Sequence, residues 1–498
     1  MTTKFLSRRR FMSASVAALG ASAVSASPTL AKDPPKTVSD NMPEQTFDAV
    51  VLGGSAAGLV TAISAHDAGA KVVVLEKCDR PDGNSIYSMG CIAAWGTKFQ
   101  NSLGIKDSRE DFYDTMMKVS VGRADPDLTR VYTDNITDGV NWLQDELKVP
   151  FKRVLNFTWP ILRRACQVDG KGMTGGGGLV QTLLKRARER GIPILFEHKA
   201  IKLETNDAGA VIAVIAQTPT QKIRFNARGG IALCTGGFSA NQELTGIYIG
   251  EWASRLSLRG SHSVTGENVT LTKPLFAKLV NMGHFHAGPI SSETHTNPAE
   301  VLNCGYGVIV NMQGKRFVDE SFTYVTKAKT CAQLTPENKA WVVMDSKWKN
   351  NAATVKKYQN MNAVYFSATS IEELCKKANI PPKAAMQSVN AYNKAVDNQT
   401  TAEMTPPCTY AKPFKVDKGP FYAFPFEGGM TATYGGPKID VKGRVLNLEN
   451  KPIVGLYAAG NAAGGLFYKD YLGGSQLGAC TVFGRIVGRE MAARAKKA

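Results

Sequence analysis

Apolar runs separated by glycine-rich turns predict a parallel β-sheet at the start of the folded chain. The run at 47–52 is almost wholly apolar and leads into a turn at 53–58 that holds three glycines. An amphipathic pattern over 59–68 predicts a helix, and a second apolar run at 71–75 ends at Glu76. A strand, a glycine turn, a helix and a second strand with an acidic end predict a unit that binds a dinucleotide.

The residues of this turn have distinct expected roles. Gly53 makes the tight turn, and Gly58 lets the helix pack closely on the strand. Ser55 stands where the usual fingerprint has its second glycine, so the backbone approach to the cofactor is tighter here. We expect the helix N-terminus to receive the pyrophosphate and Glu76 to accept hydrogen bonds from ribose hydroxyls.

Two later apolar runs also end in glycine turns. One covers 231–235, after a β-rich segment at 194–225, and is followed by Gly236 and Gly237. The other covers 455–459 and leads through a loose loop to a helix that begins near Ser475. A helix start offers free N–H groups and a positive dipole end, which suit a ring carbonyl or an anion.

Between 283 and 431 the pattern changes. The segments 306–311 and 314–320 predict a hairpin that turns at Gln313 and Gly314, and 341–345 predicts a strand. A helix with a capping box is expected to open at Ser370.

The region between the first two glycine turns is expected to be mainly helical. The segment 107–147 predicts helical scaffold with a capped start at Asp127. The glycine-rich stretch 171–178 predicts a flexible loop or hinge before a helix at 180–190.

The length of 498 residues allows two or more domains, and the formal net charge is +18. This charge indicates either an ordinary basic surface, an acidic protein partner or anionic substrates. Lys and Arg are scattered and not clustered in a stripe, which argues against nucleic acid. The nine cysteines form no haem, iron–sulfur or zinc pattern.

The N-terminal residues predict an export signal. Arg8 and Arg9 precede a mildly apolar run at 13–26, with small-residue cleavage points at Ala26 or Ala31. This pattern is similar to a Tat signal and predicts a periplasmic protein exported with its cofactor. No later apolar run is long enough for a transmembrane anchor.

Taken with the segment 82–85, the three strand-and-glycine motifs resemble the FAD-binding flavoproteins of the fumarate reductase and succinate dehydrogenase family, over roughly 47–493. The resemblance implies an α/β fold: a Rossmann-like, discontinuous FAD-binding domain with an inserted, mobile α+β capping domain. It divides the chain into a signal peptide, a linker, the first FAD-binding part, the capping domain and the second FAD-binding part, at 1–31, 32–46, 47–285, 286–431 and 432–498.

The implied cofactor is FAD. Family members that attach it covalently use a histidine soon after the first glycine cluster, and none lies between His66 and His198, so we expect non-covalent FAD. The glycine turns, the acidic strand end and the C-terminal loop supply the expected contacts: Gly53, Ser55, Ala56, Ala57, Gly58, Glu76, Lys77, Asn84, Ser85, Thr235, Gly236, Gly237, Gly460, Asn461, Ser475, Gln476 and Leu477.

The sequence departs from the family at the residues that grip fumarate. Tyr324 and Tyr471 stand at the positions of its two arginines, and Gly288 and Ala432 at those of its two histidines. Each lost charge-assisted hydrogen bond is worth ~1.5–3 kcal/mol. This loss argues against fumarate or succinate as the substrate.

The tyrosine pair is similar to that of 3-ketosteroid dehydrogenases in the same superfamily, as are Asn461 and the segment 419–423. The segment 464–475 is more similar to tricarballylate dehydrogenase-like flavoproteins. Both resemblances imply hydride exchange between flavin N5 and a carbon beside an activated C–C bond. In this chemistry Tyr471 donates a hydrogen bond to the carbonyl, with the backbone N–H near Ser475, and Tyr324 gives or takes the proton.

Other polar residues give weaker signals. His284, His286 and His295 lack the spacing and companions of a metal site, so a solvated or substrate-facing position is expected, and no metal is predicted. Arg163 and Arg164 fit a surface pair or a carboxylate site, and Arg259 is expected to be structural. The tyrosines themselves could also be ordinary core residues.

These features predict an exported FAD-dependent oxidoreductase that acts on a C–C bond next to a carbonyl or carboxyl group. Its small-molecule substrate is an enoate or enone, and its electrons come from a separate protein such as a cytochrome, or from a quinone system. Two alternatives stay open: a dehydrogenase of a ketosteroid-like or tricarboxylate-like substrate, and a flavin electron carrier without a substrate.

Overall fold

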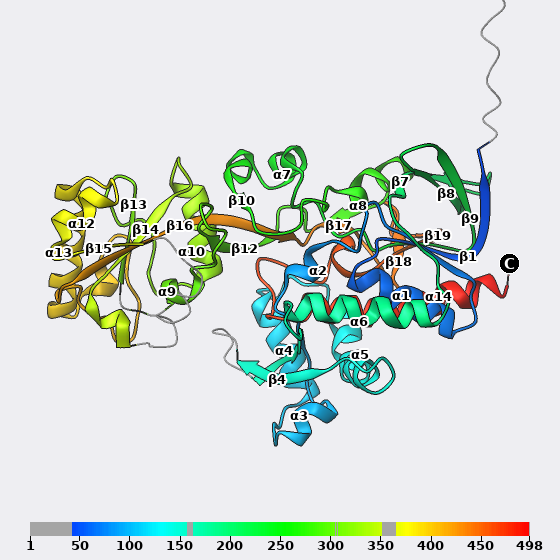
Figure 1. Cartoon of the computed structure of the whole chain (residues 1–498), viewed down its shortest axis with the longest axis horizontal. Coiled ribbons are helices and arrows are strands. Elements are labelled where there is room, and N and C mark those ends of the chain that lie inside the picture. Colours follow the sequence, from blue (N-terminus) through cyan, green and yellow to red (C-terminus); the bar gives the residue numbers. More distant parts are fainter. Residues whose placement is uncertain (1–41, 157–162, 304, 306, 351–364, 498) are drawn as a thin grey trace, which may run out of the picture. The chain divides into compact units, whose positions relative to one another are not determined.

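The computed structural model describes residues 42–498 apart from 157–162, 304, 306, 351–364 and 498. The expected signal and most of the linker lie outside these residues. Two large sheets, each with helices, make up most of the described chain (Figure 1). None of its helices is long and apolar enough to cross a membrane.

The first sheet has eight strands and is mainly parallel. Its central order is β18-β19-β9-β1-β2-β6, with β8 and then β7 added antiparallel beside β9. Leu52 pairs in register with Leu75 and Leu233, so three strands end together at one edge. The strands are β1 (Glu44–Leu52), β2 (Val72–Leu75), β6 (Ile194–Leu195), β7 (Lys199–Thr205), β8 (Val211–Gln217), β9 (Lys222–Leu233), β18 (Arg444–Leu446) and β19 (Pro452–Ala458).

Helices α1 (Ala56–Asp67) and α14 (Ser475–Ala495) pack against each other beside this sheet. Gly484 and Gly488 of α14 make this closeness possible, because a Cβ at Gly488 would lie 2.4 Å from the carbonyl oxygen of Thr61. The C-terminal helix therefore completes the fold that the first strand begins.

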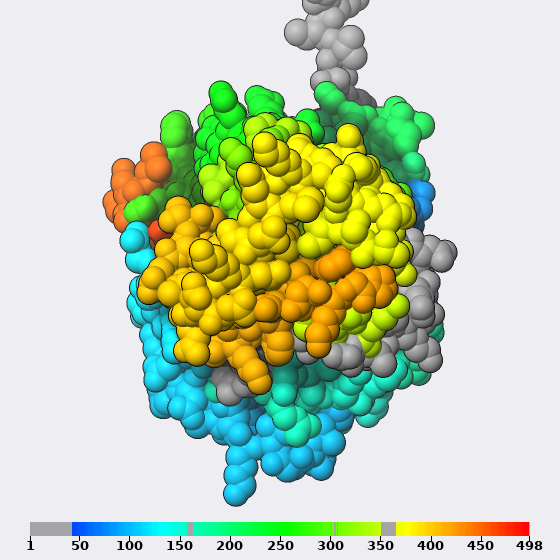
Figure 2. Space-filling view, turned by 90° about the vertical axis from the view of Figure 1, so that its left-hand side faces the viewer, coloured from blue at the N-terminus to red at the C-terminus, as the bar shows by residue number. Residues whose placement is uncertain are grey.

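The second sheet is built on β16 (Phe421–Thr433), which pairs with β10, β12, β14 and β15. One face of β13 and β14 packs under helices α12 and α13, which Figure 2 shows in yellow, and the other face packs against α9 and α10. Its remaining elements are β10 (Ser257–Leu258), β12 (Phe285–Ile290), α9 (Ala299–Asn303), β13 (Gly307–Asn311), α10 (Tyr324–Leu334), β14 (Ala340–Met344), β15 (Phe366–Ala368), α12 (Ile371–Lys377) and α13 (Pro382–Asn398).

Smaller elements lie between the strands of the two sheets along the chain. A three-stranded sheet has β5 between β3 and β4, and β11 pairs with β17. These strands and the helices beside them are α2 (Asn84–Tyr87), β3 (Cys91–Ala93), α3 (Lys98–Ser102), α4 (Arg109–Val119), α5 (Pro126–Asp145), β4 (Phe151–Asn156), β5 (Arg163–Val168), α6 (Gly175–Glu189), α7 (Gln242–Tyr248), α8 (Glu267–Thr270), β11 (Leu279–Val280) and β17 (Gly436–Pro437).

The glycine run 175–178 is not a loop, contrary to the sequence prediction. It forms the first turn of α6, capped by the Thr174 hydroxyl, which accepts from the N–H of Gly177. The run is pressed against the chain around α2: a Cβ at Gly176 would lie 1.9 Å from the carbonyl oxygen of Ser85. The glycines serve close packing, a long-range requirement that the local pattern does not show.

Two smaller expectations were also wrong. The segment 314–320 forms no second strand; it turns back at Gly314 and makes one bridge, between Val310 and Arg316, while β13 pairs with β14. The cap of α5 is Asp125 and not Asp127, since its carboxylate accepts from the N–H groups of Asp127 and Leu128.

Candidate active site

A cavity of about 320 Å³ lies at the edge where β1, β2 and β9 end. It contains most of the expected cofactor contacts and both tyrosines. The predicted residues that line it are Gly53, Ser55, Ala57, Glu76, Lys77, Asn84, Ser85, Thr235, Gly236, Tyr324, Asn461, Tyr471, Gln476 and Leu477. The remaining expected contacts, Ala56, Gly58, Gly237, Gly460 and Ser475, do not line it.

The first glycine turn has the geometry that its pattern predicts. Gly53 has φ +111°, a conformation that disfavours side chains, and a Cβ there would lie 2.5 Å from the carbonyl oxygen of Cys234. A Cβ at Gly58 would lie 1.8 Å from the carbonyl oxygen of Gly53. Ser55 is the N-cap of α1 but makes no capping bond, so the N–H groups of the first helical turn are open to an anion.

Glu76 is buried at the end of β2 and held by backbone N–H groups. Its two oxygens accept from Gly54 at 2.7 Å and from Cys78 at 2.9 Å. Burial raises the pKa of this carboxyl group, with the two backbone hydrogen bonds opposing the shift. Each oxygen keeps a lone pair, so acceptance from a ribose hydroxyl remains compatible with this geometry.

Two other predicted contacts already have protein partners. Lys77 donates from Nζ to Glu267 at 2.6 Å and to Thr265 at 2.7 Å. The Asn84 side chain accepts from the N–H of Ser261 and donates to the carbonyl oxygen of Thr431. Their side chains join segments of the cavity wall, which is a positioning role.

Buried polar atoms without partners test whether FAD fits. Within the described chain, Ser55 Oγ, Asn461 Oδ1 and Gln476 Nε2 are buried, line the cavity and have no hydrogen-bond partner. Such atoms are costly unless a bound group satisfies them. With the open N-termini of α1 and α14 they supply donors and acceptors for a phosphate and a polar ring, so the residues present fit FAD.

Two of the five expected contacts that do not line the cavity have contacts within the protein. Ser475 donates from Oγ to the carbonyl oxygen of Leu472 at 2.6 Å, so its hydroxyl serves the start of α14. Gly237 abuts Thr433, whose hydroxyl accepts from the N–H of Phe238. Contact between the cofactor and these residues stays a prediction.

Tyr324 and Tyr471 meet at one end of the cavity, with His286 between them. The His286 ring lies 4.8 Å from the Tyr471 ring and 6.4 Å from the Tyr324 ring, both edge to face. Tyr324 is the first residue of α10, Tyr471 lies in the loop before α14, and His286 is on β12. Three segments far apart in sequence thus supply one group of polar side chains.

Burial keeps these three side chains neutral. It raises the pKa of Tyr471 well above its usual value, with Tyr324 and Asp470 adding to the shift. It raises that of Tyr324, opposed by Arg259. It lowers the pKa of His286 far below its usual value, with help from Arg259 and Lys329. The phenols therefore keep their protons at neutral pH and act as donors.

The histidines share no site, as their positions show. His286 lines the cavity, and its buried Nδ1 has no partner among the described residues. The His284 ring packs 3.9 Å from that of Tyr468, and His295 is exposed. No sequence pattern separates His286 from His284 and His295; its place in the cavity follows from the pairing of β12 with β16.

The expectation for Arg164 was wrong, and Arg259 lies at a position that the sequence did not indicate. Arg164 is buried and forms an ion pair with Asp107, so it is neither a surface residue nor part of the cavity. Arg259, expected to be structural, lines the cavity and donates from Nη1 to the hydroxyl of Thr431 at 2.8 Å. Its position depends on strand pairing, which the sequence did not reveal.

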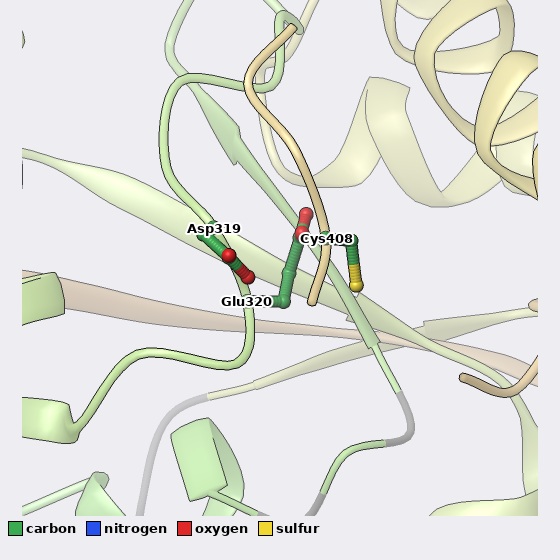
Figure 3. Close-up of side chains that lie close together, drawn as sticks. All are labelled: Asp319, Glu320 and Cys408. Atoms are coloured by element: carbon green, nitrogen blue, oxygen red, sulfur yellow. The ribbon is translucent and has the colours of Figure 1, made fainter. Parts of the chain in front are cut away.

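Asp319, Glu320 and Cys408 lie close together outside this cavity (Figure 3). Their side chains have protein partners: Glu320 accepts two hydrogen bonds from Arg316, and Asp319 accepts from Thr409 and Ser321. Burial also raises the pKa of the Cys408 thiol. The cluster therefore fixes two loops beside the second sheet to each other, and the expectation of no metal stays a prediction.

The comparisons with known proteins agree with this geometry. A family model described as an FAD binding domain matches residues 48–477. The chain belongs to the FAD-binding flavoproteins of the fumarate reductase and succinate dehydrogenase family. The α/β fold, the FAD-binding character and the oxidoreductase class expected from the sequence are thereby confirmed.

This flavoprotein is 30% identical over 457 residues to the NADH:fumarate oxidoreductase of Klebsiella pneumoniae, covering 91% of this chain and 48% of that protein. It therefore spans about half the length of that relative. The open conformation of a flavocytochrome c3 fumarate reductase superposes with a TM-score of 0.80 at 28% identity, covering 91% of this chain and 79% of that one.

The 3-ketosteroid-Δ4-(5α)-dehydrogenase of Rhodococcus jostii shares the fold, with a TM-score of 0.73 at 24% identity. That similarity covers 92% of this chain and 99% of that chain. The fold is thus shared by proteins named for different substrates, so the fold by itself does not decide the substrate of this chain.

Proposed function

We propose that this flavoprotein reduces the C=C bond of an α,β-unsaturated carboxylic or carbonyl compound. The observation that carries this proposal is the pair of buried, protonated tyrosines facing one end of the cofactor cavity. The fumarate reductases among its relatives support the same reaction type. FAD, bound non-covalently, supplies the hydride when it is reduced.

The side chains of the cavity supply the rest of the chemistry. Tyr471 donates a hydrogen bond to the carbonyl or carboxyl oxygen and stabilises the negative charge that develops there. Tyr324 gives its proton to the carbon beside that group, and the C=C bond becomes a single bond. The phenol is then reprotonated from water. His286 stays neutral beside both rings and orients them.

Electrons are proposed to come from a separate redox protein, such as a cytochrome, or from a quinone. The name of the flavocytochrome c3 relative supports a haem protein in that role. The net charge of +18 favours an acidic partner. The twin arginines at Arg8 and Arg9 support Tat export to the periplasm, which fractionation of cells carrying both Arg→Lys changes will test.

Anaerobic mixing of the reduced, FAD-loaded protein with enoates, enones and ketosteroids tests the reaction. We expect at least one enoate or enone to reoxidise the flavin much faster than a blank. Reduction of the oxidised flavin by a saturated ketosteroid or tricarboxylate would support the dehydrogenase alternative instead. If no compound reacts, the remaining alternative is a flavin electron carrier without a substrate. Release of the flavin on acid denaturation would support non-covalent binding.

A further inference from the structure

Arg259 is held at the substrate end of the cavity by the sheet of the cap. It directly follows β10, and its backbone N–H donates to the carbonyl oxygen of Met430 on β16 at 2.8 Å. Its guanidinium donates to the Thr431 hydroxyl and lines the cavity with both tyrosines. Backbone pairing thus fixes the position of the Arg259 backbone, and the hydrogen bond to Thr431 helps to fix the position of its guanidinium.

Two glycines make room for the arginine. Gly288 on β12 and Gly429 on β16 are paired in register, so the sheet carries no side chain at that point. A Cβ at Gly288 would lie 1.8 Å from Nη1 of Arg259, and one at Gly429 would lie 2.4 Å from its Cδ. Arg259 therefore lies across a patch of sheet without side chains. Any residue other than glycine at 288 or 429 would collide with it.

In the part of the chain that the structure describes, the guanidinium pairs with the Thr431 hydroxyl and forms no ion pair with a carboxylate. Among the described residues, the ionisable groups that act on it are the hydroxyls of Tyr324 and Tyr471, which keep their protons, and the His286 ring, which burial also keeps neutral. Burial lowers the pKa of Arg259, but an arginine starts so high that it stays charged at neutral pH. Burying a cation whose partner is a neutral hydroxyl costs free energy. Binding of an anion beside the cation reduces that cost.

We propose that Arg259 binds the carboxylate of the substrate, so that the flavoprotein selects unsaturated monocarboxylates over neutral enones and over dicarboxylates. One cation beside two neutral phenols balances one negative charge, and among the described residues no second cation lines this end of the cavity to match a second carboxylate. The choice of reacting bond rests on the proposed function, whereas the anion site does not.

Binding without turnover tests this anion site. The oxidised, FAD-loaded protein is titrated with 3-phenylpropionate and propionate, and with their uncharged amides, by calorimetry and by the flavin spectrum. We expect Arg259→Gln to weaken carboxylate binding roughly 10- to 100-fold and to leave the amides almost unchanged. Arg259→Lys should retain part of the preference. Arg255→Gln, an exposed arginine four residues earlier, is the matched control.

The inference is overturned if the unchanged protein prefers the amides or binds neither acid, or if Arg259→Gln binds the acids as tightly as before. FAD content and melting temperature identify a misfolded variant, in which case the acid-to-amide preference of the unchanged protein and of Arg259→Lys decides. Arg259-dependent acid binding without any reoxidation would support the anion site and refute the reductase. Equal rates of flavin reoxidation by enoates and enones, in the unchanged protein and in Arg259→Gln, would support the reductase and refute the anion site.

Discussion

The two ends of the cavity are built in different ways. At the cofactor end, backbone groups form most of the site. They are the turn at Gly53, the open N–H groups of α1, and the two N–H donors that hold Glu76. At the substrate end, Tyr324 at the start of α10 and Tyr471 in the loop before α14 come from separate segments and meet in the cavity. The cofactor end is thus fixed by local chain geometry and the substrate end by long-range packing.

The two ends also differ in how charge is treated. Carboxyl groups at the cofactor end are matched by hydrogen bonds, as Lys77 with Glu267 shows. At the substrate end, burial holds the tyrosines and His286 neutral around Arg259. Substitutions should therefore damage the first end through folding and cofactor content, and the second through rate and binding with FAD retained.

The largest expected effect is at Gly58. Gly58→Ala places a Cβ against the carbonyl oxygen of Gly53, so α1 must move away from β1. We expect destabilisation of about 1–3 kcal/mol or more, with loss of most FAD, measured by denaturation and by flavin absorbance. Gly246→Ala is the control, because no atom lies within 4 Å of a Cβ at that helical position. Full FAD content in Gly58→Ala would contradict the expectation that FAD binding depends on the geometry of this turn.

The next largest effect is at Tyr324. Tyr324→Phe removes the proposed proton donor and should slow flavin reoxidation by the substrate roughly 10²–10⁴-fold, with normal FAD content. The solvent isotope effect on that step should disappear or change. Stopped-flow measurement in light and heavy water checks both expectations. An unchanged rate would mean that Tyr324 is a packing residue of α10.

Tyr471→Phe should have a somewhat smaller effect, since it removes one hydrogen bond to the developing charge. We expect roughly a 10²–10³-fold lower rate, with the solvent isotope effect retained. Tyr434→Phe is the matched control: its hydroxyl is buried near Tyr471 but has no partner in the described structure and does not line the cavity. Loss of FAD in Tyr471→Phe would show a structural role instead.

The smallest effect is a pH dependence of stability at Lys329. Burial lowers the pKa of this amine from 10.5 to about 8. The folded state therefore releases the proton before the unfolded state does, so stability should rise between pH 8 and pH 10.5. Lys329→Met should stabilise the protein at neutral pH by about 1–3 kcal/mol and flatten this rise, as measured by denaturant titration. A slope equal to that of the unchanged protein would contradict the shift.

Most of the main sheet could be predicted from the sequence. Apolar periodicity and the glycines at 53 and 58 report local geometry, and β1, α1 and β2 form where the pattern places them. The pattern gave a wrong result at 175–178, where glycines serve contact with a distant segment. A glycine has the same identity in a loop and in a tight contact, so its neighbours in sequence do not distinguish the two.

By itself, the sequence determined the dinucleotide turn, the strand, helix and second strand around it and, through the family resemblance, the positions of Tyr324 and Tyr471. Only the tertiary structure decided that Arg259 and His286 join them. Their place depends on the pairing of β10 and β12 with β16, and on the bare patch that Gly288 and Gly429 create. Such contacts are set by register between strands far apart along the chain, which no local spacing records.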